Sequence, residues 1–183
     1  MRIGIDISQI VHEGTGVGTY VRSIVRELLL IDQKNVYVLF GASLRKLSRF
    51  TKFYNEVRVI NPRVRLVTAP IPPTILEFVW NRLHVMPVEW LIGQVDVFWS
   101  SDWAHPPLRG AKGVTTIHDV SFLRYPETFA KTILDVQKRR LARVKRECKA
   151  VFCDSEATKR DVVQLLGFEN TKLHVVYPGF QEH

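Results

Sequence analysis

Three short stretches of the sequence carry residue types that suit binding or chemistry, and the first is EGTGVGTYV at positions 13–21. Its glycines, Gly14, Gly16 and Gly18, come just before a segment of helical period. Glycines in this place let backbone amides and the positive end of a helix approach an anion such as a phosphate. A turn that needs glycine only for positive φ angles would use the same residues, so both explanations stay open.

The glycine stretch departs from two common phosphate-binding motifs. Gly14 and Gly16 fit the first two positions of a dinucleotide fingerprint, but the third position is Thr19. No acid follows at the separation that binds a ribose hydroxyl, and the lysine of a P-loop is missing. The stretch remains compatible with an anion-binding loop before a helix or with a glycine turn, and it argues against a nicotinamide-dependent oxidoreductase.

The second stretch, TTIHDVSFLRYPE at 115–127, places His118 and Asp119 directly after an apolar strand pattern. Ligands of open α/β sheets bind at the carboxyl ends of strands, and imidazole can donate or accept a hydrogen bond near neutral pH. Asp119 could orient the ring or bind a hydroxyl. Adjacent residues on a strand point to opposite sides, so a purely structural histidine stays open.

The third stretch, SSDWAHPPL at 100–108, follows another strand pattern and belongs to the same predicted edge. Asp102, Trp103 and His105 could contact a polar, ring-shaped ligand there. A proline-bounded loop whose tryptophan covers the core explains the same residues.

The elements that must position these residues follow from hydrophobic periodicity. Short β-branched runs alternate with longer stretches of helical period, which predicts an α/β domain with a Rossmann-like, doubly wound, mainly parallel sheet of about seven strands and helices on both faces. The predicted strands are Arg2–Ile7, Val36–Phe40, Val57–Ile60 with Val64–Val67, Val95–Trp99, Val114–Ile117, Ala150–Cys153 and Leu173–Val176.

The predicted helices have apolar residues at helical spacing on one face. They are Thr19–Ile31, Leu44–Tyr54, Ile75–Ile92 with a break at Pro87 left open, Glu127–Cys148 and Glu156–Leu166. Ser155 is placed to cap the last helix, and Gly167 follows its end.

The composition is that of an ordinary globular domain. The chain has 183 residues, of which 46% are hydrophobic and 24% charged, and no apolar run is long enough to span a bilayer. The start, MRIGIDI, enters a strand pattern without the features of a signal peptide, so we expect a cytoplasmic protein. Cys148 and Cys153 are too few for a disulfide framework, and we expect reduced core thiols.

The formal net charge of +8 suits an anionic partner but does not identify one. In the basic run from Lys138 to Arg146, Leu141 and Val144 are spaced as an inward stripe, which indicates a solvated helix face. Contact with a membrane or nucleic acid through this run, or through RKLSRFTKF at 45–53, stays open. The apolar stretch ILEFVWNRL at 75–83 could face a bilayer or pack on the sheet.

Taken in order, four segments resemble the N-terminal domain of retaining glycosyltransferases of the GT-B family 4. They are GTGVGTYVRSIVREL at 14–28, DVFWSSD at 96–102, HDVSFLRYPE at 118–127 and CDSEATKRDVVQLLGFENTKLHVVYPG at 153–179. The resemblance covers nearly the whole chain, and its last segment is the most specific. It implies that residues 1–177 are one Rossmann-like half of a GT-B enzyme and that 178–183 begin a linker to a donor-binding C-terminal domain absent from this chain.

The resemblance also implies roles for individual residues. His118 would lie beside the transferred sugar, and Gly14, Gly16, Val17 and Gly18 would approach the phosphates and sugar of the donor. The candidates on the acceptor side are Asp119, Asp102, Trp103 and Tyr20.

The expected activity of the full-length protein is transfer of a hexosyl group from a nucleotide-sugar, with retention, to a glycan, a lipid-linked acceptor or a small molecule. We expect the 183-residue chain alone to be inactive. The resemblance implies no bound metal and no cofactor, and the sequence agrees with this, because no carboxylate or histidine set has metal-ligand spacing. No nucleic-acid partner is expected, and peripheral contact with the inner face of the membrane is left open. The alternative from another class is a stand-alone basic α/β module that binds a membrane or nucleic acid.

Overall fold

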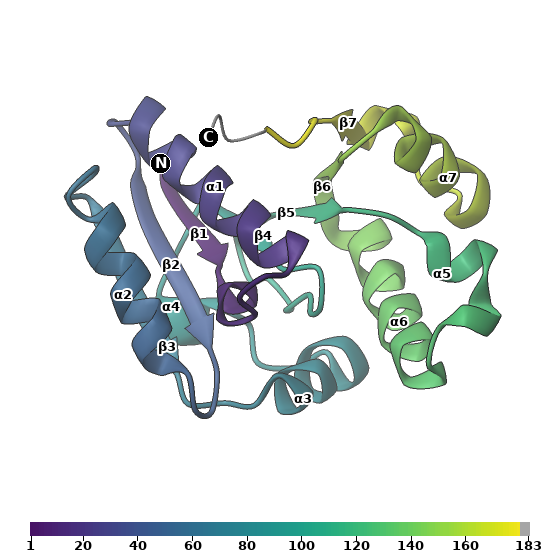
Figure 1. The fold of residues 1–183 in the computed structure, drawn as a ribbon, viewed down its shortest axis with the longest axis horizontal. Helices are drawn as coiled ribbons and strands as arrows, with labels where there is room; N and C mark the ends of the chain where they lie inside the picture. The colour runs from purple at the N-terminus through teal and green to yellow at the C-terminus, as the bar shows by residue number, and fades with distance from the viewer. Residues whose placement is uncertain (180–183) are drawn as a thin grey trace.

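The computed structural model describes residues 1–179. They form a seven-stranded sheet in which every pair of neighbours is parallel, in the order β3-β2-β1-β4-β5-β6-β7 (Figure 1). The fold class predicted from the sequence is confirmed. The strands are β1 Arg2–Asp6, β2 Val36–Ala42, β3 Val64–Ala69, β4 Val97–Ser100, β5 Lys112–Ile117, β6 Cys148–Cys153 and β7 Leu173–Val175.

Helices and short helical turns connect the strands. They are η1 Ser8–Val11, α1 Gly16–Ile31, α2 Leu47–Val57, α3 Pro73–Leu76, the π-helical η2 Glu77–Leu83, α4 Glu89–Ile92, α5 Ser121–Arg124, η3 Pro126–Thr128, α6 Lys131–Glu147, α7 Glu156–Leu166 and η4 Asn170–Lys172. Within residues 1–179, no helix has both the length and the apolar character needed to cross a membrane.

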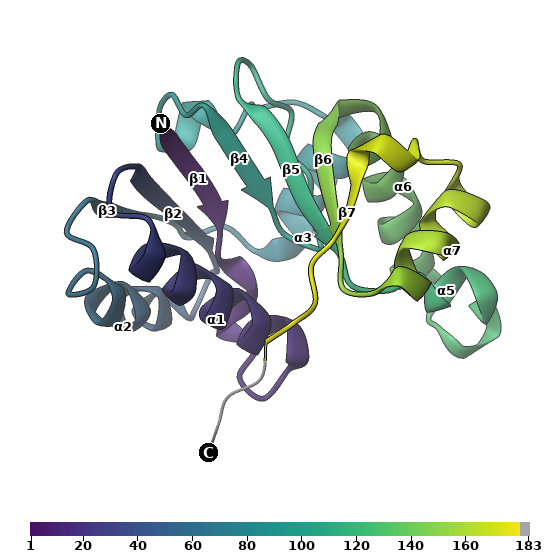
Figure 2. The same cartoon turned by 90° about the horizontal axis from the view of Figure 1, so that it is seen from above.

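Three apolar clusters hold the layers together. One joins α1 and α2 to β1–β3, with Leu29 and Phe50 fully buried. A second packs Trp80 of η2 against Phe40 of β2 and includes α4. A third joins α6 and α7 to β5–β7. Figure 2 shows α1 and α2 in front of the sheet and α3 behind it, so the sheet is covered on both sides.

The predicted strand at Val57–Ile60 is wrong. Phe50, Phe53 and Val57 lie three and four residues apart and are all buried, so helix α2 continues to Val57 and a turn follows it. The helical period of these three side chains outweighs the strand preference of the valine and isoleucine that end the segment.

Two predicted helices are interrupted. The segment 75–92 divides into α3, η2 and α4, and the break begins at His84, whose φ is 56°, ahead of Pro87. The predicted start of a helix at Glu127 is also wrong, because η3 ends at Thr128 and α6 begins only at Lys131. Phe129 lies between them in an extended conformation and packs edge-on against Phe122.

The capping predictions for the last helix are confirmed. Ser155 accepts a hydrogen bond from the Thr158 amide at 3.0 Å, and Gly167 adopts a left-handed conformation at the C-terminal end of α7. Of the predicted linker 178–183, residues 180–183 lie outside the described part of the chain.

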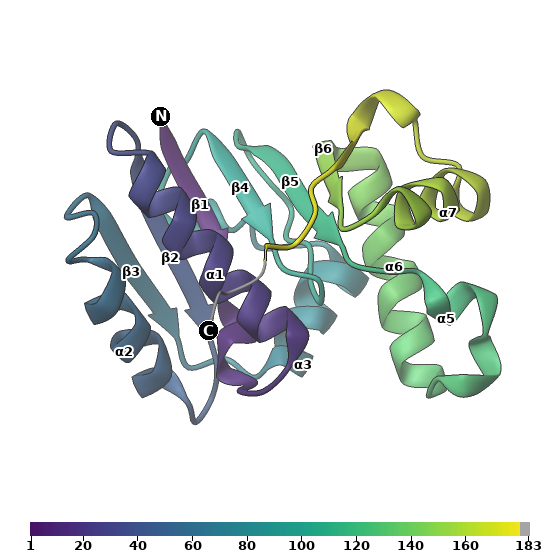
Figure 3. The same cartoon turned by 45° about the horizontal axis from the view of Figure 1, so that its top comes forward.

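The strand order reverses at β1, which has β2 on one side and β4 on the other. In doubly wound sheets, ligands bind beyond the carboxyl ends of the strands at such a reversal. In Figure 3, the arrowheads of β4 and β5 point toward one edge of the sheet. The three stretches singled out in the sequence follow β1, β4 and β5, so the topology gathers them at this edge.

Candidate active site

The carboxyl edge of the sheet contains a hollow of about 160 Å³ lined by four of the predicted site residues. Val17 reaches it from the first turn of α1, Asp102 from the segment after β4, and His118 and Asp119 from the end of β5. A smaller adjoining hollow is lined by Val17, Asp102, His118 and also Tyr20. The structure therefore brings together residues that are up to about a hundred positions apart in the sequence.

His118 is held by a carboxylate that the sequence reasoning missed. Its Nδ1 lies 2.7 Å from Oδ2 of Asp154, which follows β6. Since a carboxylate only accepts, Nδ1 carries the proton, and the lone pair of the neutral ring is on Nε2. Within residues 1–179, Nε2 of His118 has no hydrogen-bond partner, and the side chain is 19% exposed.

Two further contacts fix the position of His118. The hydroxyl of Thr158 donates to the His118 carbonyl at 3.1 Å, which ties the end of β5 to α7. The Tyr20 ring meets the imidazole edge to face, with ring centroids 4.8 Å apart at 85°. Burial raises the pKa of Tyr20, so this ring stays neutral at physiological pH, and its hydroxyl is 3.4 Å from the Thr116 hydroxyl.

Asp119 is exposed and serves the local backbone. Its Oδ1 accepts hydrogen bonds from the amide and the hydroxyl of Ser121, at the start of α5. Although Asp119 lines the hollow, one of its oxygens is already engaged. Asp119 does not hold the His118 ring, which was one of the two roles considered for it; Asp154 fills that role.

Asp102 lies beside a buried arginine. Arg140 of α6 is 2% exposed and donates to the Ser101 carbonyl, the Thr115 hydroxyl and the Thr116 carbonyl. Burial lowers the pKa of Arg140, and the charge of Asp102 raises it. Oδ1 of Asp102 is buried without a hydrogen-bond partner in the described chain, which leaves one unused acceptor on a residue that lines the hollow.

Asp6, the last residue of β1, is a second carboxylate that the sequence reasoning passed over. It is only 4% exposed, and its Oδ1 accepts the Ser8 amide at 2.8 Å. Burial raises the pKa of Asp6, while hydrogen bonds from Ser8 and Ser101 lower it. A strand-end acid in an apolar run was a possible sequence signal, but only the fold shows that this one lies at the point where the strand order reverses.

The glycine stretch is mostly the first turn of α1 and not a free loop. Thr15 caps the helix by accepting the Gly18 amide at 3.2 Å, and Gly16 begins the helix. Gly14 has a φ of 77°. A Cβ on Gly18 would come within 2.7 Å of the His12 carbonyl, so close packing alone requires glycine at this position. A positive φ angle therefore explains the glycine at position 14, and close packing explains the glycine at position 18.

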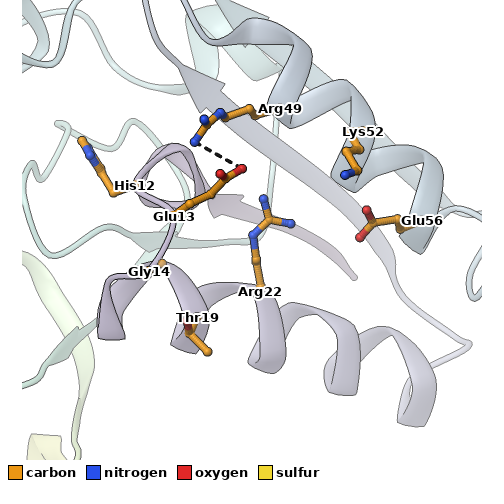
Figure 4. A pocket seen from close by; sticks show the side chains of 9 residues that line it. His12, Glu13, Gly14, Thr19, Arg22, Arg49, Lys52 and Glu56 are labelled. Carbon is orange, nitrogen blue, oxygen red and sulfur yellow. Dashed lines mark ion pairs between the residues drawn. The ribbon is translucent and has the colours of Figure 1, made fainter.

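Gly14 and Gly18 line a different hollow, of about 260 Å³, between α1 and α2 (Figure 4). Its charged side chains are the cations Arg22, Arg49 and Lys52 and the acids Glu13 and Glu56. Gly16 is exposed at the start of α1 and lines neither this hollow nor the one beside His118. The three glycines are thus not equivalent.

Trp103 lines a fourth hollow, of about 350 Å³, together with Asp6 and Ser101. The segment that carries it is tied to η2 through Asn81, whose side chain donates to the Trp103 carbonyl and accepts from the His105 amide, both at 2.9 Å. Trp103 also packs on the second core cluster, so it has the core-covering role considered for it as well as access to a hollow.

His105 proves to be a core residue. Its side chain is fully buried, and Nδ1 lies 2.9 Å from the Ser100 hydroxyl. Glu147, 3.5 Å from the other ring nitrogen, binds His84 more closely, at 3.0 Å. His105 was a ligand-contact candidate in the sequence, and its burial removes it from that group.

Cys148 and Cys153 are free, buried thiols, as predicted. Burial raises the pKa of Cys148 to about 12 and that of Cys153 to about 11, which keeps both protonated. Residues 1–179 contain no group of three or more His, Cys, Asp or Glu side chains arranged to hold a metal ion.

The parallel sheet and the reversal of strand order at β1 define a doubly wound α/β domain, and the polar groups at its carboxyl edge form the candidate site. Residues 14–182 match the model of Glycosyltransferase Family 4. The match covers well over half of the chain, and the chain therefore belongs to this family. No curated protein matches the sequence.

Proposed function

We propose that the chain is the acceptor-side half of a retaining glycosyltransferase that moves a hexosyl group from a nucleotide-sugar to an acceptor, and that a C-terminal domain supplies the rest of the donor site. The observation that carries this proposal is the state of His118. Its ring is fixed by Asp154, its other nitrogen is unpaired in the described chain, and the residue lines a hollow at the carboxyl edge of the sheet.

In the proposed reaction, the bond between the anomeric carbon and the leaving phosphate breaks as the acceptor oxygen bonds to that carbon on the same face. The acceptor proton passes to a phosphate oxygen, so the protein need not supply a base. His118 would orient the sugar and stabilise developing charge. A preorganised polar group of this kind contributes about 3–4 kcal/mol to lowering a barrier.

The first turn of α1 would serve the donor phosphates. Gly16 and Val17 stand at the N-terminal end of a 16-residue helix, where unpaired amides and the helix dipole favour an anion. Val17 lines the same hollow as His118, which supports one continuous donor site.

A donor screen tests this proposal. The full-length protein is incubated with UDP-, GDP- and ADP-sugars, and hydrolysis and transfer are measured beside the His118→Ala variant. We expect one donor class to be used, with retention of the anomeric configuration in the product. If no sugar nucleotide is turned over, or if the product is inverted, the proposal is overturned.

Peripheral membrane contact is a second proposal, supported by exposed apolar side chains on the 75–85 segment. Trp80 and Leu76 pack inward, but Ile75, Phe78 and Leu83 are each about half exposed. The basic run of α6 supports it less, because Arg140 is buried and Arg139 pairs with Glu77. Co-sedimentation with anionic vesicles, compared with a Phe78→Ser variant, tests it; equal binding by the two proteins would exclude this surface.

A further inference from the structure

The hollow beside Trp103 has the features of a site for a single ring-shaped ligand. Its walls are mainly apolar, from Leu76 and Pro73 of α3 and from Trp103 and Ala104 after β4, and its volume is about 350 Å³. Small-molecule sites usually combine apolar walls with a few polar groups that fix orientation. Here the charged group is Asp6.

Asp6 stands in the wall between two hollows. It lines the hollow beside Trp103, and with Ser101 it also lines the small hollow that His118 borders. One of its oxygens accepts the Ser8 amide, which orients the carboxyl group. A ring hydroxyl that donates to Asp6 would therefore lie on the side of the ring nearest His118.

The hollow between α1 and α2 is cationic and borders the first one. Arg22, Arg49 and Lys52 point into the space between the two helices (Figure 4). Two of these cations are held in place: Arg49 donates to the Val11 carbonyl at 2.7 Å, and Arg22 lies over the Phe53 ring at 5.2 Å. Guanidinium groups fixed in this way suit a phosphate, which they bind through paired hydrogen bonds.

Two acids oppose an anion in this hollow, Glu13 and Glu56. Three cations stand against two carboxylates, so these five side chains together carry one net positive charge. Glu13 pairs with Arg49 at 3.2 Å but is 64% exposed, and such exposed pairs are weak. An incoming phosphate can therefore displace Glu13 from Arg49.

His12 lines both hollows, which makes them neighbours. In Figure 4 its ring points away from Arg22 and Lys52. We propose that the two hollows together bind the acceptor, a hydroxylated ring that carries a phosphate group. The ring lies against Trp103 with a hydroxyl on Asp6, and the phosphate lies between Arg22, Arg49 and Lys52. This proposal rests on the proposed function and names its acceptor class.

Binding measured without a donor tests the proposal separately from catalysis. The full-length protein is titrated calorimetrically with glucose 6-phosphate, with glucose and with inorganic phosphate. We expect glucose 6-phosphate to bind at least about tenfold more tightly than either part alone, because it occupies both hollows. Vesicles with and without phosphatidylinositol, whose head group is also a hydroxylated ring on a phosphate, distinguish a lipid source from a soluble one.

Substitutions in each hollow measure its contribution to binding separately. Arg49→Gln with Lys52→Gln should weaken binding of the phosphorylated ligand about tenfold, and Arg45→Gln, an exposed cation near α2 that does not line the hollow, is the matched control. Asp6→Asn should weaken binding of the ring. Because Asp6 is buried, Thr74→Phe is a second test: Thr74 is exposed at the hollow, and phenylalanine would fill it.

The outcomes are distinct. The proposal is supported if the protein binds glucose 6-phosphate tightly, or binds phosphatidylinositol vesicles selectively, and if this binding is lost in the variants of either hollow. Equal affinity for inorganic phosphate and glucose 6-phosphate overturns it, as does equal weakening by Arg45→Gln. If neither ligand form binds although the donor screen succeeds, the acceptor class is wrong and the proposed function stands.

Discussion

His105 and His118 follow neighbouring strands of the sheet, each lies close to a carboxylate, and yet their surroundings differ. His105 is fully buried between Ser100 and Glu147. His118 has one nitrogen on Asp154, and its side chain lines a hollow. A nearby carboxylate is therefore common to both histidines, and the difference between them is that His118 borders a hollow while His105 is enclosed in the core.

The largest expected effect is on catalysis by the His118→Ala variant. If His118 lies beside the transferred sugar, kcat should fall about 10²- to 10³-fold, as for the loss of one preorganised polar group at a reaction centre. The free energy of unfolding should fall by about 1–3 kcal/mol, because the side chain is mostly buried and its removal leaves the Asp154 carboxylate without its hydrogen-bond partner. Steady-state kinetics and urea denaturation measure both. A loss of less than about threefold would remove His118 from the reaction centre.

The His105→Ala variant should lose stability but keep its kcat. Removing this ring leaves a cavity and an unpaired Ser100 hydroxyl in the core, which should lower the free energy of unfolding by about 2–3 kcal/mol. The kcat of the fraction that remains folded should stay within about threefold of wild type. Activity lost without any loss of stability would contradict the assignment of His105 to the core.

The Asp154→Asn variant tests the role of the carboxylate that holds His118. The amide can still contact Nδ1 of His118, but it removes the charge and can present an NH₂ group where a carboxylate oxygen accepted the proton. We expect kcat to fall about tenfold, less than in His118→Ala, because Asp154 positions the ring and does not touch the sugar. The KM for the donor should change little. A loss larger than that of His118→Ala would assign Asp154 a more direct role.

The smallest expected effect is on the pH dependence of stability. Burial lowers the pKa of His105, although Glu147 opposes this shift. The folded pKa is then below the unfolded value of about 6.5, so the contribution to stability is complete above about pH 6.5 and is lost as the pH falls toward the folded pKa. His105→Gln should reduce the slope of unfolding free energy against pH in this window. If the wild type became more stable on acidification and His105→Gln did not, the predicted direction of the pH dependence would be wrong.

Most strands of the sheet could be predicted from the sequence. Most of its inner strands contain runs of apolar residues, as expected of strands covered on both faces, and every predicted strand except Val57–Ile60 overlaps an observed one. The exception had mixed signals. Val57 belongs both to a β-branched run and to the buried face of α2, and only the packing of Phe50 and Phe53 decides between them.

The site was predictable only in part. A strand-end position brought His118 and Asp102 to one edge, because parallel strands end together. Asp154 directly follows β6 and comes to the same edge, but its position in the sequence does not show that β6 lies next to β5 or that the carboxylate meets His118. Position also could not separate His118 from His105, because the burial of a ring depends on the packing of distant segments around it. Asp6 was hidden within an apolar strand pattern.

The most direct test of this account is an NMR titration of the full-length protein with ¹⁵N-labelled histidines. The donor identified in the sugar-nucleotide screen is added, and the imidazole nitrogen resonances are followed. We predict that the His118 signals shift, most of all that of Nε2, and that the His105 signals do not move. If the His105 signals shift while the His118 signals stay unchanged, the placement of the reaction centre at the end of β5 is contradicted.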